Sequence, residues 1–149
     1  MAINFNDTTP AAAAGGVNVK WQTDGAGNDS AYVPSAGFTK AVVVFTAGVN
    51  TNAQIILSAA LGIGIKFPAS APSSVANAKV AATSSTTYTL KKNGSSFCTV
   101  NFAGSATTGT FTQASDATFT ATDILEIDGP GTADATLAGV SITLVGITT

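Results

Sequence analysis

Residues 88–102 constrain the fold of this chain more than any other stretch. Apolar and polar residues alternate in two runs, 88–92 and 97–102, and Asn93-Gly94 stands between them. This dipeptide readily adopts the positive φ angles that a tight reversal requires. The pattern therefore predicts a β-hairpin within a β-rich domain.

Similar short runs recur along the chain at spacings of about 8 to 12 residues, as in β-sandwiches and barrels. Region 54–67 favours a strand, because Gly62, Gly64 and its β-branched residues disfavour a helix, although residues 54–61 (Gln54 to Leu61) leave a short helix open. Residues 69–80 are expected to form a loop with one helical turn. With these runs we predict an all-β fold, a jelly-roll-like β-sandwich of about eight strands with an extended N-terminal arm. The other expected strands are 17–21, 38–45, 110–113, 117–121, 124–127 and 140–147.

The first 36 residues differ in composition from the rest of the chain. They are rich in Ala, Gly and polar residues, so they bury too little apolar area to fold alone. We therefore expect an attachment arm over residues 1–36 and a β-sandwich domain over residues 37–149. Phe5, Trp21 and Tyr32 are the predicted anchors of the arm, docking on a partner or on the chain's own domain; alternatively, they complete an intramolecular core.

The charged residues exclude most catalytic chemistry. The chain has no His and no Arg, and its formal net charge is -2. It therefore lacks the imidazole of nucleophilic triads, the guanidinium of bidentate anion sites and the basic footprint of nucleic-acid binders. We expect no enzymatic activity, no catalytic residue, no cofactor and no nucleic-acid partner. Cys98, the single cysteine, lies in an alternating run and is expected to be buried and unreactive.

The acidic residues Asp123, Glu126, Asp128 and Asp134 gather around a Gly-Pro-Gly turn. Their oxygens could bind calcium, but the spacing differs from the twelve-residue calcium loop. Glu126 and Asp128 would share one side of a strand with no visible partner. We interpret the cluster as a solvated turn and expect no metal.

The outward positions of the expected strands carry mostly Thr, Ser, Ala and Asn. Only 9% of the residues are charged, against about 25% in typical domains. Neutral faces of small residues can pack against other chains without desolvating ions, which favours contact with neighbouring subunits. The alternative is a monomer of unusually low charge.

Membrane insertion and secretion are not expected. The longest apolar region, 55–65, is shorter than the ~20 residues of a membrane span, and the first residues lack the basic and apolar parts of a signal peptide. We expect a soluble protein made in a reducing compartment.

A resemblance to a known family rests on the hairpin region. The motif Leu90-Lys91-Lys92-Asn93-Gly94 with its partner Thr108-Gly109-Thr110-Phe111 resembles a β-rich domain that recurs in tailed-bacteriophage virion proteins. The similarity extends from Phe67 to the C-terminus, and residues 19–22 and 30–34 resemble a virion attachment segment. Where family members have a small residue after the Asn-Gly turn, this chain has Phe97-Cys98. The resemblance implies a structural or adhesive virion component and no catalytic residue.

These features predict a non-enzymatic capsid decoration or cement protein that binds the head shell and bridges capsid subunits. The expected partners are the major capsid protein and copies of the chain itself, as a homodimer or homotrimer. The expected location is the virion, after synthesis in the bacterial host cytoplasm. The alternative is a short tail-fibre or receptor-binding protein that recognises a host surface glycan, although the chain has no shaft repeats.

Overall fold

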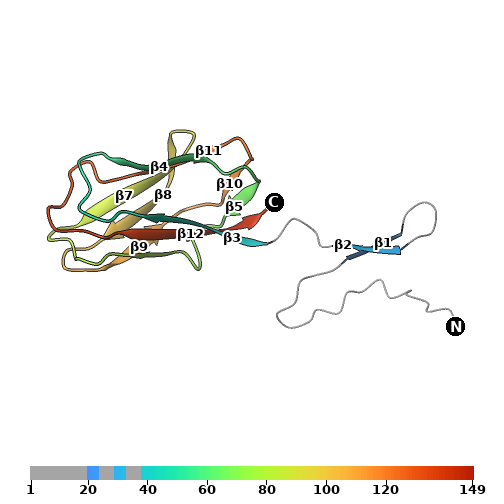
Figure 1. Cartoon of the computed structure of the whole chain (residues 1–149), viewed down its shortest axis with the longest axis horizontal. Helices are drawn as coiled ribbons and strands as arrows, with labels where there is room; N and C mark the ends of the chain where they lie inside the picture. The colour runs from blue at the N-terminus through green and yellow to red at the C-terminus, as the bar shows by residue number, and fades with distance from the viewer. Residues whose placement is uncertain (1–19, 24–28, 33–37) are drawn as a thin grey trace. The chain divides into compact units, whose positions relative to one another are not determined.

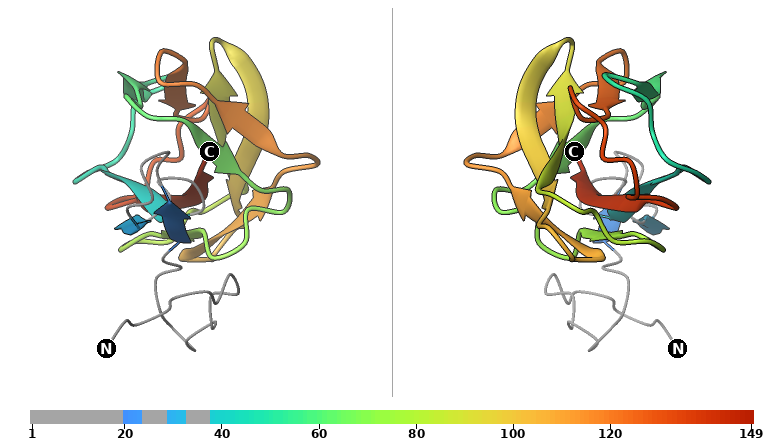
Figure 2. Two further views of the ribbon diagram at one scale, coloured as in Figure 1. Left: turned by 90° about the vertical axis from the view of Figure 1, so that its right-hand side faces the viewer. Right: turned by 90° about the vertical axis from the view of Figure 1, so that its left-hand side faces the viewer.

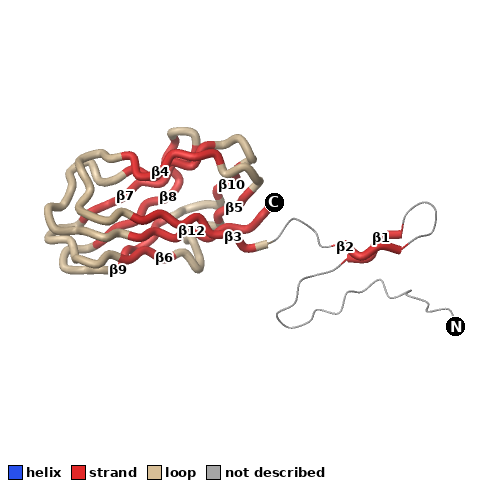
Figure 3. Tube along the Cα trace, in the orientation of Figure 1, coloured by secondary structure: helices blue, strands red, loops and turns tan. Residues whose placement is uncertain are grey.

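The computed structural model describes residues 20–23, 29–32 and 38–149. The chain divides into two compact units, Met1–Gly37 and Phe38–Thr149. Every regular element of the described residues is a strand, and none of them forms a helix (Figure 3). The all-β prediction is confirmed.

The first unit contributes one described hairpin. Strands β1 (Lys20–Thr23) and β2 (Asp29–Tyr32) pair antiparallel, with Lys20 opposite Tyr32. The strand expected over residues 17–21 overlaps β1, whereas no strand was expected at the position of β2. Most of the predicted arm lies outside the described residues, so its extended form stays a prediction.

The second unit is one antiparallel sheet of ten strands. Its order is β10-β5-β12-β6-β9-β8-β7-β11-β4, and β3 pairs with the other side of β12. Both β5 and β6 use the same edge of β12, each along a different part of it. The strands are β3 (Thr39–Phe45), β4 (Ile55–Ala60), β5 (Ile65–Phe67), β6 (Val75–Asn77), β7 (Thr86–Lys92), β8 (Ser95–Phe102), β9 (Thr108–Thr112), β10 (Ala117–Phe119), β11 (Ile124–Asp128) and β12 (Ser141–Thr148).

The sheet curls around a single core. Alternate residues of β7, β8, β11 and β12 are buried, as expected where one face of each strand points inward. Leu90 of β7 and Ile127 of β11 lie on neighbouring strands, and they share one apolar cluster with Leu144 of β12, which β6, β9 and β8 separate from β7 in the sheet order. Figures 1 and 2 show how the sheet wraps so that these strands surround the core.

The hairpin prediction is confirmed. β7 and β8 pair along their length, and Asn93 and Gly94 have φ angles of 48° and 82°. Region 54–67 forms two strands, β4 and β5, so the strand interpretation is correct. The helical turn expected within residues 69–80 is wrong: this segment contains β6, which is held between β12 and β9.

Candidate functional site

The predicted arm anchors lie in the first unit. Trp21 is on β1 opposite Ala31, and Tyr32 ends β2 opposite Lys20. Phe5 lies outside the described residues. The assignment of these three aromatics as anchors stays a prediction.

An exposed, uncharged face of β3, β12 and β6 is the first candidate site in the second unit. Val43, Thr143 and Val75 lie side by side across the three strands, and Phe45, Ser141 and Asn77 form the next row. Val43 is 63% exposed, Phe45 54% and Val75 52%. We call this surface the neutral face; it consists of the outward positions Thr39, Ala41, Val43, Phe45, Ser141, Thr143, Val145, Ile147, Val75 and Asn77.

Charges lie at the margins of the neutral face. Lys79 places its ammonium nitrogen 5.6 Å from the centroid of the Phe45 ring. At another margin, Lys66 lies opposite Ile147 and forms an ion pair with Asp116 at 3.2 Å. A partner could therefore cover the centre of the face without desolvating an ion, which suits a protein–protein contact.

A groove of about 480 Å³ is the second candidate site. It lies beside the tip of the β7–β8 hairpin, against β10. Its walls combine an acid, an ammonium group, hydroxyls and an amide with one aromatic ring. The lining residues are Lys92, Asn93, Ser95, Ser96, Phe97, Asp116, Ala117 and Thr118.

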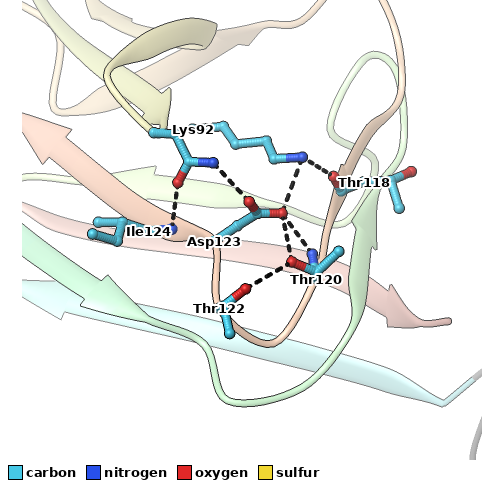
Figure 4. Close-up of polar contacts among 7 residues, drawn as sticks. Lys92, Thr118, Thr120, Thr122, Asp123 and Ile124 are labelled. Carbon is cyan, nitrogen blue, oxygen red and sulfur yellow. Dashed lines mark hydrogen bonds and ion pairs between the residues drawn. The ribbon is translucent and has the colours of Figure 1, made fainter.

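One wall of the groove is fixed by the polar network in Figure 4. The Asn93 side chain donates to Asp123 Oδ1 at 2.6 Å and accepts from the backbone N–H of Ile124 at 2.8 Å. Lys92 donates to the carbonyl oxygen of Thr118 at 2.6 Å and forms an ion pair with Asp123 at 3.1 Å. The network therefore ties the hairpin tip to the turn between β10 and β11.

The same network keeps Asp123 ionised. The backbone N–H of Thr120 donates to its carboxylate at 2.7 Å. This bond, followed by the contacts from Asn93 and Lys92, holds the pKa of Asp123 well below its usual range. The ionised carboxylate of Asp123 therefore stabilises the turn between β10 and β11 through these contacts.

The floor of the groove is aromatic. The Phe97 ring packs against Phe67 and Phe119, with centroid distances of 6.1 and 5.5 Å. Phe67 and Phe119 are fully buried, whereas Phe97 is partly exposed. The core therefore supports the one aromatic side chain that lines the groove.

The structure corrects the interpretation of the acidic cluster as a solvated turn. Asp134 is only 7% exposed, and its oxygens accept hydrogen bonds from Thr83, Ser84, Thr136 and Leu137. The pKa of Asp134 is held well below its usual range, first by the Thr83 hydroxyl at 2.6 Å and then by Thr136. These donors stabilise an ionised carboxylate at position 134. No pattern in the sequence indicates that the Asp134 side chain is buried.

Glu126 and Asp128 also have a partner that the sequence did not reveal. The register places Lys91 of β7 beside them, and its ammonium group forms ion pairs with both carboxylates. The contact with Asp128, followed by that with Glu126, raises the pKa of Lys91. These acids therefore cross-link β11 to β7.

In the part of the chain that the structure describes, no group of three His, Cys, Asp or Glu residues could hold a metal ion.

Cys98 is buried in the core, as its alternating run predicted. Burial raises the pKa of its thiol to about 11, so at neutral pH the thiolate is scarce.

Among the described residues, no helix has the length and apolar character to cross a membrane.

Comparisons of the chain with protein-family models, curated proteins and solved structures give no match.

Proposed function

We propose that this chain is a non-enzymatic structural protein of a tailed-bacteriophage virion, a capsid decoration or cement protein that bridges subunits of the head shell. Its partners are the major capsid protein and copies of itself, as a homodimer or homotrimer. In this proposal the β-rich unit is a jelly-roll-like sandwich, and residues 1–36 form an attachment arm anchored by Phe5, Trp21 and Tyr32.

The neutral face carries the proposal. Val43, Phe45 and Val75 are each more than half exposed and lie in adjacent rows of one sheet surface. A soluble domain normally interrupts such a surface with charge, because contiguous exposed apolar area promotes association. A cement protein needs this kind of surface, since it stabilises the shell by burying area against subunits in their assembled arrangement. The resemblance of the hairpin motif to virion proteins supports the same assignment.

Co-sedimentation with purified, expanded phage heads tests the proposal. Val75→Lys puts a charge on the β6 side of the neutral face, and Thr87→Lys puts the same charge at an exposed position of β7. We expect the unmodified chain and Thr87→Lys to bind the heads, and Val75→Lys to bind at least about tenfold more weakly because an unpaired ammonium would be buried. Absence of binding by the unmodified chain, or equal binding by all three proteins, would overturn the proposal.

The groove favours one alternative, a short tail-fibre or receptor-binding protein that recognises a host surface glycan. Sugars are bound by converging polar groups beside an apolar or aromatic surface, and Asp116, Asn93 and Phe97 offer this combination. Binding to host cells or their polysaccharide that Ser96→Lys abolishes and Thr87→Lys preserves would support the alternative. Binding to heads alone would refute it.

A further inference from the structure

Strand β3 forms an open edge of the sheet. It pairs with β12 through seven consecutive residue partners, Phe45↔Ser141 to Thr39↔Ile147, without a register shift, and no other described strand pairs with it. The other open edges are less regular. β4 faces a register irregularity in β11, and β10 has only three residues. β3 is therefore the longest regular edge in the described part of the chain.

The direction of the backbone groups along β3 follows from its ends. The N–H of Thr46 donates to the carbonyl oxygen of Val140, and the N–H of Thr148 donates to that of Phe38. In an antiparallel ladder, hydrogen-bonded pairs alternate with non-hydrogen-bonded pairs. The even-numbered residues of β3 therefore bond to β12, and Thr39, Ala41, Val43 and Phe45 direct their N–H and C=O groups away from β12.

The edge lacks the features that usually prevent strand pairing. Natural edge strands are protected by proline, bulges or several charges. β3 has no proline and no bulge against β12, and its single charge, Lys40, lies near one end. The residues with outward backbone groups include Val43 and Phe45, two of the most exposed large apolar side chains of the described residues.

We propose that β3 pairs antiparallel with β3 of a second copy of this chain, about a two-fold axis at Val42. This inference rests on the homo-oligomer of the proposed function and names its interface. In this register Thr39 lies opposite the second copy's Phe45, and Ala41 opposite its Val43. All four residues with outward backbone groups then pair, which forms about eight hydrogen bonds.

The sequence of β3 complements itself in this register. A small side chain lies opposite a large one in both outward pairs, which favours interdigitation. Lys40 lies opposite Val44 of the second copy. If one β3 strand is shifted by two residues along the other, in either direction, one of the four hydrogen-bonded pairs is lost. A shift of four residues in one direction also places the Lys40 side chains of the two copies opposite each other.

The dimer would join two neutral faces into one continuous surface. The strands β6, β12 and β3 of one copy would continue into β3, β12 and β6 of the other, with every outward position of the joined strands uncharged. The surface available for the shell in the proposed function is thereby doubled.

Sedimentation equilibrium of the full chain tests the pairing. Val43→Lys places a charge beside the two-fold axis, and Val75→Lys places the same charge on the same face but two strands from the edge. We expect the unmodified chain and Val75→Lys to be dimers, and Val43→Lys to dimerise at least tenfold more weakly. A monomer or trimer of the unmodified chain would overturn the inference. So would weaker dimerisation of Val75→Lys than of Val43→Lys, which would indicate contact through the face.

Disulfide formation tests the register independently. Two copies of residue 42 would form a non-hydrogen-bonded pair with Cβ atoms about 4.5 Å apart, within reach of a disulfide. Two copies of residue 44 would be roughly 14 Å apart along the strands. Val42→Cys is therefore expected to form a cross-linked dimer on mild oxidation, and Val44→Cys is not. The unmodified chain controls for the buried Cys98, and circular dichroism verifies the fold of each variant.

Equal cross-linking of the two cysteine variants, or none in Val42→Cys, would overturn the register. Head binding is measured separately in each case. A monomer that binds heads refutes the β3 pairing and the homo-oligomer but leaves the head-binding role standing. A β3 dimer that binds no heads refutes the head-binding role but leaves the β3 pairing standing.

Discussion

The hydroxyl of Tyr88 offers a quantitative test of the core. Its side chain is 1% exposed, and its hydroxyl donates to Asn50 Oδ1 at 2.8 Å. Tyr88→Phe removes this bond but keeps the ring and its edge-on contact with Phe102. At pH 7 we expect the variant to lose about 1 kcal/mol in free energy of unfolding, since a buried acceptor loses its closest donor.

The effect should reverse in alkali. Burial raises the pKa of Tyr88 from 10.0 to about 12. The pKa of Tyr88 in the folded state lies above its value in the unfolded state. The neutral hydroxyl's contribution to the free energy of unfolding is therefore fully present below pH 10 and is lost as the pH rises through 12. The loss amounts to about 1.4 kcal/mol at pH 11 and roughly 3 kcal/mol above pH 12. The stability advantage of the unmodified protein should therefore vanish at about pH 11.

Urea denaturation followed by circular dichroism, repeated from pH 7 to pH 12, measures this crossover. All other titrating groups are present in both proteins, so the difference between their free energies of unfolding isolates Tyr88. Titration of phenolate absorbance should independently show one tyrosine that ionises near pH 12. A difference that stays constant from pH 7 to pH 12 would refute the reasoning.

Three further substitutions, one of them with a matched control, test other parts of the structure. Asp134→Asn should lower the melting temperature at pH 7. Because the pKa of Asp134 is depressed in the folded state, this deficit should shrink as the pH falls below 3.8, the ordinary value, in thermal scans at several pH values. Gly146→Ala would place a methyl group 2.5 Å from Ile65 Cγ2, so urea denaturation should show a loss of about 1–3 kcal/mol, whereas Gly131→Ala, with no atom within 4 Å, should be nearly neutral. Phe119→Ala should cost about 3–5 kcal/mol in the same assay because it empties the centre of an aromatic cluster; a cost below 1 kcal/mol would contradict that packing.

The strands that could be predicted are those with a local signal. Apolar and polar residues alternate over five or more residues in β7, β8, β11 and β12, so the sequence indicates which residues of these strands point inward. β6 has three residues and no period to detect. It is a strand because β12 and β9 supply its hydrogen bonds, and both are distant in the sequence.

The candidate sites follow the same division. The low charge and the neutral outward residues are visible in the sequence, and they predicted surfaces suited to contact with other chains. The meeting of Val43 with Val75 on one face depends on β12 lying between their strands. The groove depends on β10 lying near the tip of the β7–β8 hairpin.

The sequence by itself determined the class of fold, the Asn93-Gly94 turn and the absence of histidine and arginine chemistry. These properties depend on composition and on neighbours along the chain. Only the tertiary structure decided that Asp134 is buried, that Lys91 lies between Glu126 and Asp128, and that β3 is left at an open edge. Each of these depends on strand order and register, because backbone pairing in a sheet joins segments whose sequence separation carries no local signal.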